Sequence, residues 1–379
     1  MSLSLGMSSA LRHTRRLNPI LERLPKFRAK LEGVIRGENN ARVLIADDST
    51  SRGWLSSSYP NNMMLTAWPE LMAQALRALG YPAYSSLALP SFPAAVSSRM
   101  QDDRFTISGS PFASGVSGWA NFGAGFGTAC HQQTAVNTPV RFTPGATCGE
   151  CDTVDLYWVR LNTGNIDYNI NGGAWQQITT TGSGDIQKTT INIGSSATTH
   201  YIEYRHGTAD CYVVGVDFYH STQKRILIMN GGIPSAKMGA FTSTANNWTH
   251  NAMIDAIRPD LVIAGGGINE YFQSSESTAT LLGYHTTLRG QLAAMSADIE
   301  YLMKTPVPSS EAAKAGIVAA QLDLVAKYAD YAETNNLGFI DLYNEFGGSY
   351  QASLMADTVH PNDAGYERMR DIMKEALML

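Results

Sequence analysis

The sequence has no long hydrophobic run and almost no net charge. No apolar stretch approaches the ~20 residues that a membrane-spanning helix needs, so we expect no membrane span. The formal charge is −5 over 379 residues, which predicts neither nucleic acid nor a membrane surface as a partner. Residues 1–16 lack a continuous apolar segment after a basic start, so no secretory signal is expected. These absences predict a soluble protein; an extracellular or virion-associated location stays open.

Motifs for metals and phosphates are also missing. The sequence contains no HExxH or comparable spacing of metal ligands. The glycines at Gly265–Gly267 are not followed by the Gly-Lys-Ser/Thr that a phosphate-binding loop requires. We therefore expect chemistry that needs no metal and no cofactor.

Cysteines are few, and all fall in one part of the chain: Cys130, Cys148, Cys151 and Cys211. Two disulfides there would suit an oxidising environment, whereas the missing signal favours free thiols. The CxxC pair at 148 and 151 would also suit half of a zinc site, although no regular second pair accompanies it. The sequence leaves these three interpretations open.

The amino-terminal part has a helical pattern. Residues 10–37 predict one or two helices broken at Pro25, with apolar residues near helical spacing and many Arg and Lys at polar positions. We interpret residues 1–39 as a helical extension with a solvated basic face, and a docking arm for a larger assembly is the alternative.

Short apolar runs alternate with helical patterns in two parts of the chain. The first run, Val43–Ile45, leads into Asp47, Asp48 and Ser49. Further strand candidates are residues 225–230, 260–267, 298–303 and 338–343, and the helix candidates are residues 65–79, 311–334 (capped by Ser309 or Ser310) and 363–378. This alternation favours a parallel, doubly wound sheet covered on both faces.

The middle of the chain has a different texture. Residues 101–221 are dense in Gly, Ser, Thr and Asn, with alternating runs such as 154–161 and 211–219 separated by turn signals. This spacing predicts an antiparallel β-sandwich or jelly roll. We therefore divide the chain into the extension 1–39, a discontinuous α/β domain of residues 40–100 and 222–379, and an inserted sandwich of residues 101–221.

Three residues at the two ends of the α/β part form a candidate catalytic set. A serine hydroxyl needs a base to take its proton, and the base needs an acceptor on its other ring nitrogen. Ser49 follows the first strand, and Asp357 and His360 lie three residues apart in a loop before the last helix. If both loops lie at the carboxyl edge of one sheet, Ser49 and His360 can meet.

Acyl transfer also needs hydrogen-bond donors for the developing oxyanion. Residues 265–270, GGGINE, end a strand with glycines that allow close backbone approach and with Asn269, whose amide can donate. The preceding strand ends in residues 230–235, NGGIPS, which offer backbone N–H groups.

These blocks, in this order, resemble the signature blocks of the SGNH (GDSL) hydrolase superfamily. The blocks are ADDST around Ser49, the NGGIPS turn, GINE, and DTVHP followed by NxxGY. The resemblance covers about residues 40–100 and 222–379, and it implies a flavodoxin-like α/β/α sandwich with esterase, deacetylase or lipase activity. It implies that Ser49 is the nucleophile, that Asp357 and His360 complete the triad, and that Ser235, Gly267 and Asn269 form the oxyanion hole.

This chain departs from the family pattern in three places. Asp47 stands where the family usually has Gly, which puts the geometry of the Ser49 turn in question. Ser235 aligns with the family's oxyanion glycine, although Gly231 or Gly232 would take the role if the alignment shifts. Glu270 replaces the usual Asp.

The predicted sandwich is similar in texture to carbohydrate-binding jelly-roll modules of polysaccharide deacetylases in this superfamily, including those carried by phage tails. Trp119, Trp158 and Trp175 could stack on sugar rings, or could belong to the sandwich core or rim.

We predict a serine esterase that removes O-acetyl groups from an acetylated polysaccharide. One alternative is a glycan-binding or phage virion structural protein with a silent hydrolase domain, which Asp47 and Ser235 motivate. A short-chain lipase or thioesterase is another. The sequence does not indicate the sugar, the acetylated position or the oligomeric state.

Overall fold

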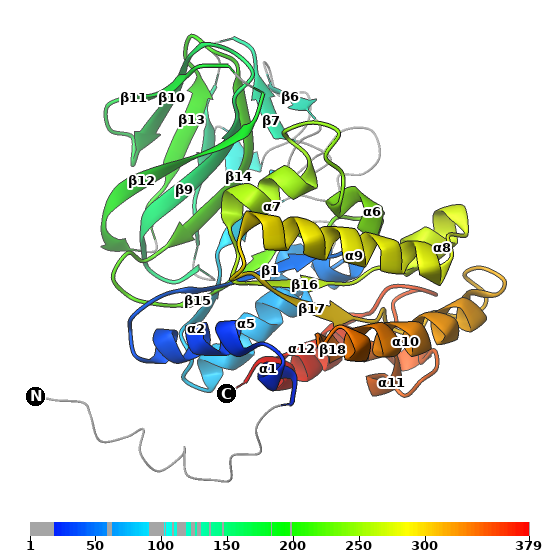
Figure 1. Ribbon diagram of the computed structural model, residues 1–379. Helices are drawn as coiled ribbons and strands as arrows, with labels where there is room; N and C mark the ends of the chain where they lie inside the picture. The colour runs from blue at the N-terminus through cyan, green and yellow to red at the C-terminus, as the bar shows by residue number, and fades with distance from the viewer. Residues whose placement is uncertain are drawn as a thin grey trace, which may run out of the picture.

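The computed structural model describes residues 19–378 (Figure 1), apart from short stretches within that range. These stretches are residues 59–62, 91–101, 103, 108–109, 112–118, 123–125, 127–129, 136–137, 146–147, 183 and 198. The first part of the predicted amino-terminal helix, residues 10–18, lies outside the described residues.

A parallel sheet forms the centre of the α/β part. Its strands, in spatial order, are β18 (Gly338–Ile340), β17 (Glu300–Lys304), β16 (Leu261–Ala264), β1 (Ala41–Ala46), β15 (Ile226–Asn230) and β2 (Ala83–Ser85). After β1, the chain adds β2 and β15 on one side of it, and then crosses over to add β16, β17 and β18 on the other side. At such a switch point, the carboxyl ends of the neighbouring strands open onto a crevice, which is where parallel sheets bind ligands.

Helices cover both faces of this sheet. Alternate residues of a buried strand point to opposite faces, so each central strand contributes to the hydrophobic core on either side. In β1, Val43 and Ile45 join one hydrophobic core, whereas Leu44 and Ala46 join the other. The first core includes residues of α1 (Pro19–Glu22), α2 (Pro25–Ile35), α5 (Trp68–Ala78) and α12 (Asp363–Leu377). The second includes residues of α6 (Met238–Phe241), α7 (His250–Ile257), α9 (Thr278–Met295) and α10 (Ile317–Thr334).

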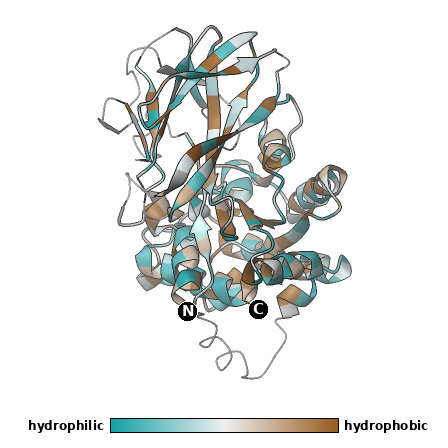
Figure 2. Cartoon of the chain, turned by 90° about the vertical axis from the view of Figure 1, so that its left-hand side faces the viewer, coloured by the Kyte–Doolittle hydropathy of each residue, from teal (hydrophilic) through white to brown (hydrophobic). Residues whose placement is uncertain are grey.

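Two antiparallel sheets form the sandwich that stands above the α/β part in Figure 2. One has the order β11 (Gln176–Thr180), β10 (Gly164–Ile170), β13 (Ile202–His206), β8 (Val140–Phe142), β4 (Phe105–Ile107), β5 (Ser110–Pro111). The other has the order β12 (Ile186–Ala197), β9 (Cys151–Val159), β14 (Cys211–Tyr219), β7 (Cys130–Gln133), β6 (Trp119–Phe122), with β3 (Leu87–Ala88) paired to β14. The α/β fold with an additional antiparallel β part is therefore confirmed, while the exact domain limits remain a prediction.

The second antiparallel sheet is buried on both faces. Val154, Leu156 and Trp158 of β9 face the core between the two antiparallel sheets. Tyr157 and Val159 of the same strand join the core above the parallel sheet, together with residues of α7 and α9. Almost every residue of β9 and β14 is therefore buried, including those whose side chains point to opposite faces. It also means that the sandwich and the α/β part share one hydrophobic core.

Several boundaries differ from those expected, and two of them have a clear local cause. The predicted strand 338–343 ends at Ile340, because the Asp341 side chain accepts a hydrogen bond from Asn344 N (3.1 Å) and caps α11 (Leu342–Glu345). The predicted helix 311–334 begins at Ile317 rather than after Ser309 or Ser310. There the Glu311 carboxylate accepts from the backbone N–H groups of residues 316 and 318, which supplies the cap from outside the helix.

Cys148, Cys151 and Cys211 form no disulfide within the described part of the chain, and all three are buried. Burial raises the pKa of the Cys151 thiol to about 11, so this thiol stays protonated at neutral pH. The side chain of Cys130 lies outside the described residues. No helix in the described residues has the length and apolar character needed to cross a membrane.

A buried cluster of charges joins the first parallel strand to the sandwich. Arg42, in β1, lies 3.3 Å from Asp217 and 3.7 Å from Asp155, and both carboxylates are fully buried. Its guanidinium also lies 5.5 Å from the centre of the Tyr219 ring. Burial raises the pKa of Asp217, while the charge of Arg42 lowers it. Lys188 Nζ also lies 3.3 Å from Asp155, so Arg42 shares Asp155 with Lys188 and is the cation paired with Asp217.

We expect Arg42→Met to destabilise the protein by about 3–5 kcal/mol, because removing one partner leaves a buried charge uncompensated. The measurement is the midpoint of urea denaturation. The triple variant Arg42→Met, Asp155→Asn, Asp217→Asn is the matched control, and it should recover most of the loss. An unchanged midpoint in the single variant would contradict this role for Arg42.

Candidate active site

Ser49 lies at the carboxyl end of β1, at the start of the short helix α3 (Ser49–Arg52). Asp48 caps this helix, because its Oδ1 accepts hydrogen bonds from Thr50 N (2.9 Å) and Thr50 Oγ1 (2.8 Å). Burial and the neighbouring charge of Asp47 raise the pKa of Asp48, and these bonds counteract part of the shift. The bonds between Asp48 and Thr50, the two neighbours of Ser49, therefore fix the backbone of the turn that carries Ser49.

The loop before α12 holds Asp357 and His360 in a fixed arrangement. Asp357 Oδ1 accepts from the backbone N–H groups of Val359 (2.7 Å) and His360 (2.6 Å). Its other oxygen, Oδ2, lies 2.9 Å from His360 Nδ1. Burial alone would raise the pKa of Asp357, but the hydrogen bonds and charge of His360 outweigh it and lower that pKa to about 2. Asp357 is therefore a carboxylate at any pH near neutral.

The two loops meet, although they are far apart in the sequence. Ser49 Oγ lies 3.0 Å from His360 Nε2, within hydrogen-bond distance. Ser49 is 7% exposed, and the His360 side chain is 18% exposed. The structure thus brings Ser49, His360 and Asp357 into one continuous hydrogen-bonded path.

Residues after His360 hold the two loops together. Tyr366, in α12, donates its hydroxyl to the carbonyl of Trp54 (2.8 Å), just after α3. Asp363 Oδ1 accepts from Ser57 N (2.8 Å), and the rings of Trp54 and His360 lie 6.3 Å apart between centres. These contacts fix the His360 loop against the segment that carries Ser49.

The residues expected to form the oxyanion hole lie at the ends of β15 and β16. Asn269 is in α8 (Ile268–Ser274), and its Nδ2 donates to the carbonyl of Ala236 (2.9 Å). An amide nitrogen carries two hydrogens, so a second one remains for another acceptor. The N–H of Gly267 donates instead to Glu270 Oε2 (2.7 Å), so it is already engaged within its own loop.

Ser235 has a backbone conformation that usually requires glycine. Its φ is 64°, in the left-handed region. The carbonyl of Ser235 accepts from Gln273 Nε2 (3.0 Å), and this bond attaches the turn to α8. The turn thus keeps a glycine-like geometry although a serine occupies the position.

Asp47, the main departure from the family pattern, is paired with a buried lysine. Lys304 Nζ, at the end of β17, lies 2.7 Å from Asp47 Oδ2, and both side chains are only 1% exposed. The same oxygen accepts from the hydroxyl of Ser51, which in turn accepts from Trp68 Nε1 (2.8 Å). Asp47 therefore binds α3 through the hydroxyl of Ser51, while Lys304 compensates its charge.

The sequence analysis did not identify Lys304. The available signal was a lysine directly after the apolar run Tyr301–Met303, at the carboxyl end of a strand expected to be buried. Among the residues that the structure describes, no three His, Cys, Asp or Glu side chains are grouped as metal ligands would be.

A doubly wound parallel sheet with a serine, a histidine and an aspartate at its switch point is the arrangement typical of a serine hydrolase. The GDSL-like lipase/acylhydrolase family model matches residues 193–368, a span that includes Asn269, Asp357 and His360 but not Ser49. This match supports a carboxylic ester hydrolase similar to the SGNH (GDSL) hydrolases.

The chain is similar to several solved structures, one of which shares its fold over most of its length. A peptidoglycan O-acetylesterase, 15% identical, matches 93% of this chain and 95% of its own length with a TM-score of 0.65. A family 2 carbohydrate esterase from Clostridium thermocellum, 8% identical, matches 65% of this chain and 93% of its own with a TM-score of 0.32. A family 3 carbohydrate esterase from Talaromyces cellulolyticus, 14% identical, matches 41% and 72% with a TM-score of 0.32. No curated protein sequence matches the chain.

We expect Lys304→Met to destabilise the protein by about 3–5 kcal/mol, because Asp47 would remain buried without its cation. Thermal and urea denaturation measure the loss. The double variant Asp47→Asn, Lys304→Met removes both charges and should recover much of it. If the double variant is as unstable as the single one, the ion pair is not the reason for the effect.

Proposed function

We propose that this chain is a serine esterase that removes O-acetyl groups from a polysaccharide through an acyl-enzyme. The single observation behind the proposal is the hydrogen-bonded path from Ser49 Oγ through His360 to Asp357, with distances of 3.0 and 2.9 Å. A serine and a histidine at this separation have the geometry of an activated nucleophile and its base.

In the proposed first step, His360 Nε2 takes the proton of Ser49 Oγ, which attacks the acetyl carbonyl carbon. Asp357 stabilises the imidazolium that forms and holds its ring in place. The tetrahedral intermediate then collapses, His360 gives the proton to the sugar oxygen, and the sugar leaves with a free hydroxyl. Water attacks the acetyl-serine in the same way, which releases acetate and restores Ser49.

The oxyanion of the tetrahedral intermediate needs donors already fixed in position. We propose the second hydrogen of Asn269 Nδ2, the backbone N–H of Ser49, and an N–H of the turn around Ser235. The bond from Asn269 to Ala236 O supports this choice, because it ties the amide to the turn. Gly267 fits a supporting role better, since its N–H is engaged by Glu270.

The choice of a polysaccharide substrate is the less direct part of the proposal. It is supported by the fold shared over nearly the whole chain, antiparallel sheets included, with an enzyme that acts on O-acetylated peptidoglycan. Trp158 does not contribute to it, because this side chain is buried in the sandwich and donates to Thr189 Oγ1 (3.0 Å). Trp175 is exposed, but Arg205 lies over its ring at 3.8 Å. The side chain of Trp119 lies outside the described residues.

We expect Ser49→Ala to lower acetate release from p-nitrophenyl acetate and from O-acetylated peptidoglycan by about 1,000-fold or more. Circular dichroism should be unchanged. Ser296→Ala, at the opposite edge of the sheet, is the matched control and should retain full activity. If Ser49→Ala turns over normally, the acyl-enzyme proposal is wrong; if only the model ester is hydrolysed by the native chain, the polysaccharide substrate is wrong.

Activity should fall with acidification, because only a neutral imidazole can accept the serine proton. Protonation of Asp357 does not cause this fall near neutral pH, since the pKa of Asp357 is lowered to about 2. Asp357→Asn should reduce kcat by at least about 100-fold without changing the melting temperature by more than a few degrees. Activity that does not fall in acid, or a fully active Asp357→Asn, would contradict the assigned roles.

A further inference from the structure

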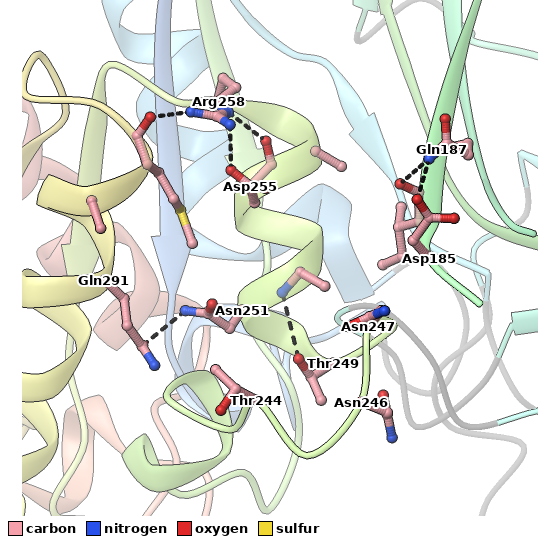
Figure 3. Close-up of a pocket in the computed structure, with 15 residues that line it drawn as sticks. Asp185, Gln187, Thr244, Asn246, Asn247, Thr249, Asn251, Asp255, Arg258 and Gln291 are labelled. Carbon is pink, nitrogen blue, oxygen red and sulfur yellow. Dashed lines mark hydrogen bonds and ion pairs between the residues drawn. The ribbon is translucent and has the colours of Figure 1, made fainter. Parts of the chain in front are cut away.

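A polar cleft of about 630 Å³ lies beside α7, away from Ser49 and His360. Figure 3 shows α7 at its floor, α9 on one side, the edge strand β12 on the other, and the loop of residues 242–249 across one end. Its volume is within the range of about 300–1,000 Å³ typical of ligand pockets.

Several polar groups of the cleft have hydrogen-bonding capacity left. Within the described residues, the side chain of Asn247 and the hydroxyl of Thr244 make no hydrogen bond, and both residues are exposed. The side-chain oxygen of Asn246 accepts from Trp248 N (3.1 Å), which leaves its side-chain nitrogen as a donor. The side-chain nitrogen of Gln187 donates to Asp185 Oδ2 (2.7 Å) and to the carbonyl of Ile186 (3.3 Å), which leaves its side-chain oxygen as an acceptor. The cleft thus offers amide donors, amide acceptors and a hydroxyl together (Figure 3).

The walls that carry these groups are fixed. The carbonyl of Asn247 accepts from Ile186 N (3.3 Å), which ties the loop to β12. On the other side, Asn251 donates to Gln291 Oε1 (2.8 Å), and Gln291 donates to Thr242 O (2.9 Å). A ligand would therefore meet groups that are already held in position.

The charges of the cleft are paired, and its floor is partly apolar. Asp255 forms an ion pair with Arg258 (2.6 Å), and Asp185 forms one with Arg160 (3.0 Å). Between the polar groups, the lining also includes Ala252, Ala256, Ala294 and Met295. An anion would find no uncompensated cation here, and an apolar ligand would leave the amides without partners.

We propose that this cleft binds a neutral segment of a glycan chain. Sugar hydroxyls both donate and accept hydrogen bonds, and the cleft offers them the side-chain nitrogen of Asn246 as a donor, the side-chain oxygen of Gln187 as an acceptor, and both groups of Asn247. The C–H face of a pyranose ring would lie on the alanines of α7 and α9. The site is separate from the Ser49 centre, so its ligand need not carry an acetyl group.

The test uses the full chain with Ser49→Ala, so that binding does not depend on ester hydrolysis. Unacetylated chitohexaose, cellohexaose and xylohexaose are titrated by calorimetry, with hexagalacturonate as the charged comparison. We expect binding of at least one neutral hexamer. No binding, or binding of hexagalacturonate alone, would overturn the proposal.

Two variants then locate the site. The double variant Asn247→Ala, Gln187→Ala should raise the Kd by at least 10-fold. Ala294→Trp places a large side chain in the cleft from an exposed position and should raise the Kd to a similar extent. Asn192→Ala, an exposed amide further along β12, is the matched control and should bind normally. Unchanged affinity in both cleft variants would place the glycan elsewhere and refute the proposal. Hydrolysis of p-nitrophenyl acetate by the native chain reports on the esterase proposal separately.

Discussion

The buried ion pair between Asp47 and Lys304 is the constraint on which the site depends. It connects the end of β1 to the end of β17, and it passes the end of β16, which lies between them. A side chain at Gly265 would collide with both members of the pair, so the first glycine of the GGG run is needed for space. The ion pair therefore spans the carboxyl ends of three neighbouring strands, next to the turn that carries Ser49. It also gives a physical reason why this chain can carry an aspartate at the position where the SGNH hydrolases usually have glycine.

The carboxyl-terminal motif has a similar explanation, because each of its residues has a structural task. Asn362 caps α12 by accepting from Gly365 N (3.0 Å). Gly365 leaves room for the carbonyl of Leu354, where a β-carbon would clash. Tyr366 reaches across to the carbonyl of Trp54. The motif thus attaches the His360 loop to the Ser49 segment. Ser49 Oγ and His360 Nε2 lie 3.0 Å apart although 311 positions separate the two residues in the sequence.

The sequence was sufficient to predict the parts that depend on local patterns. Buried parallel strands are continuous apolar runs and antiparallel strands alternate, so the fold class and the positions of the main strands followed from periodicity. The grouping of Ser49 with Asp357 and His360 followed from the order of the family blocks. The partner of Asp47 could not be predicted, because pairing across β16 depends on strand order, which a single sequence does not contain. The same limit applies to Arg42, whose two acids lie on sandwich strands.

Burial of β9 on both faces makes the position of the sandwich part of the architecture of the α/β protein. Tyr157 and Val159 pack into the same core as α7 and α9, and Arg42 links β1 to Asp155 and Asp217. A loosely tethered module would have a polar outer face and few buried charges at its junction. Because β12 belongs to this same sheet, the cleft between β12 and α7 has walls from both parts held by one core. The cleft therefore lies between elements that one core holds in place, as a site that binds one stretch of a long glycan would require.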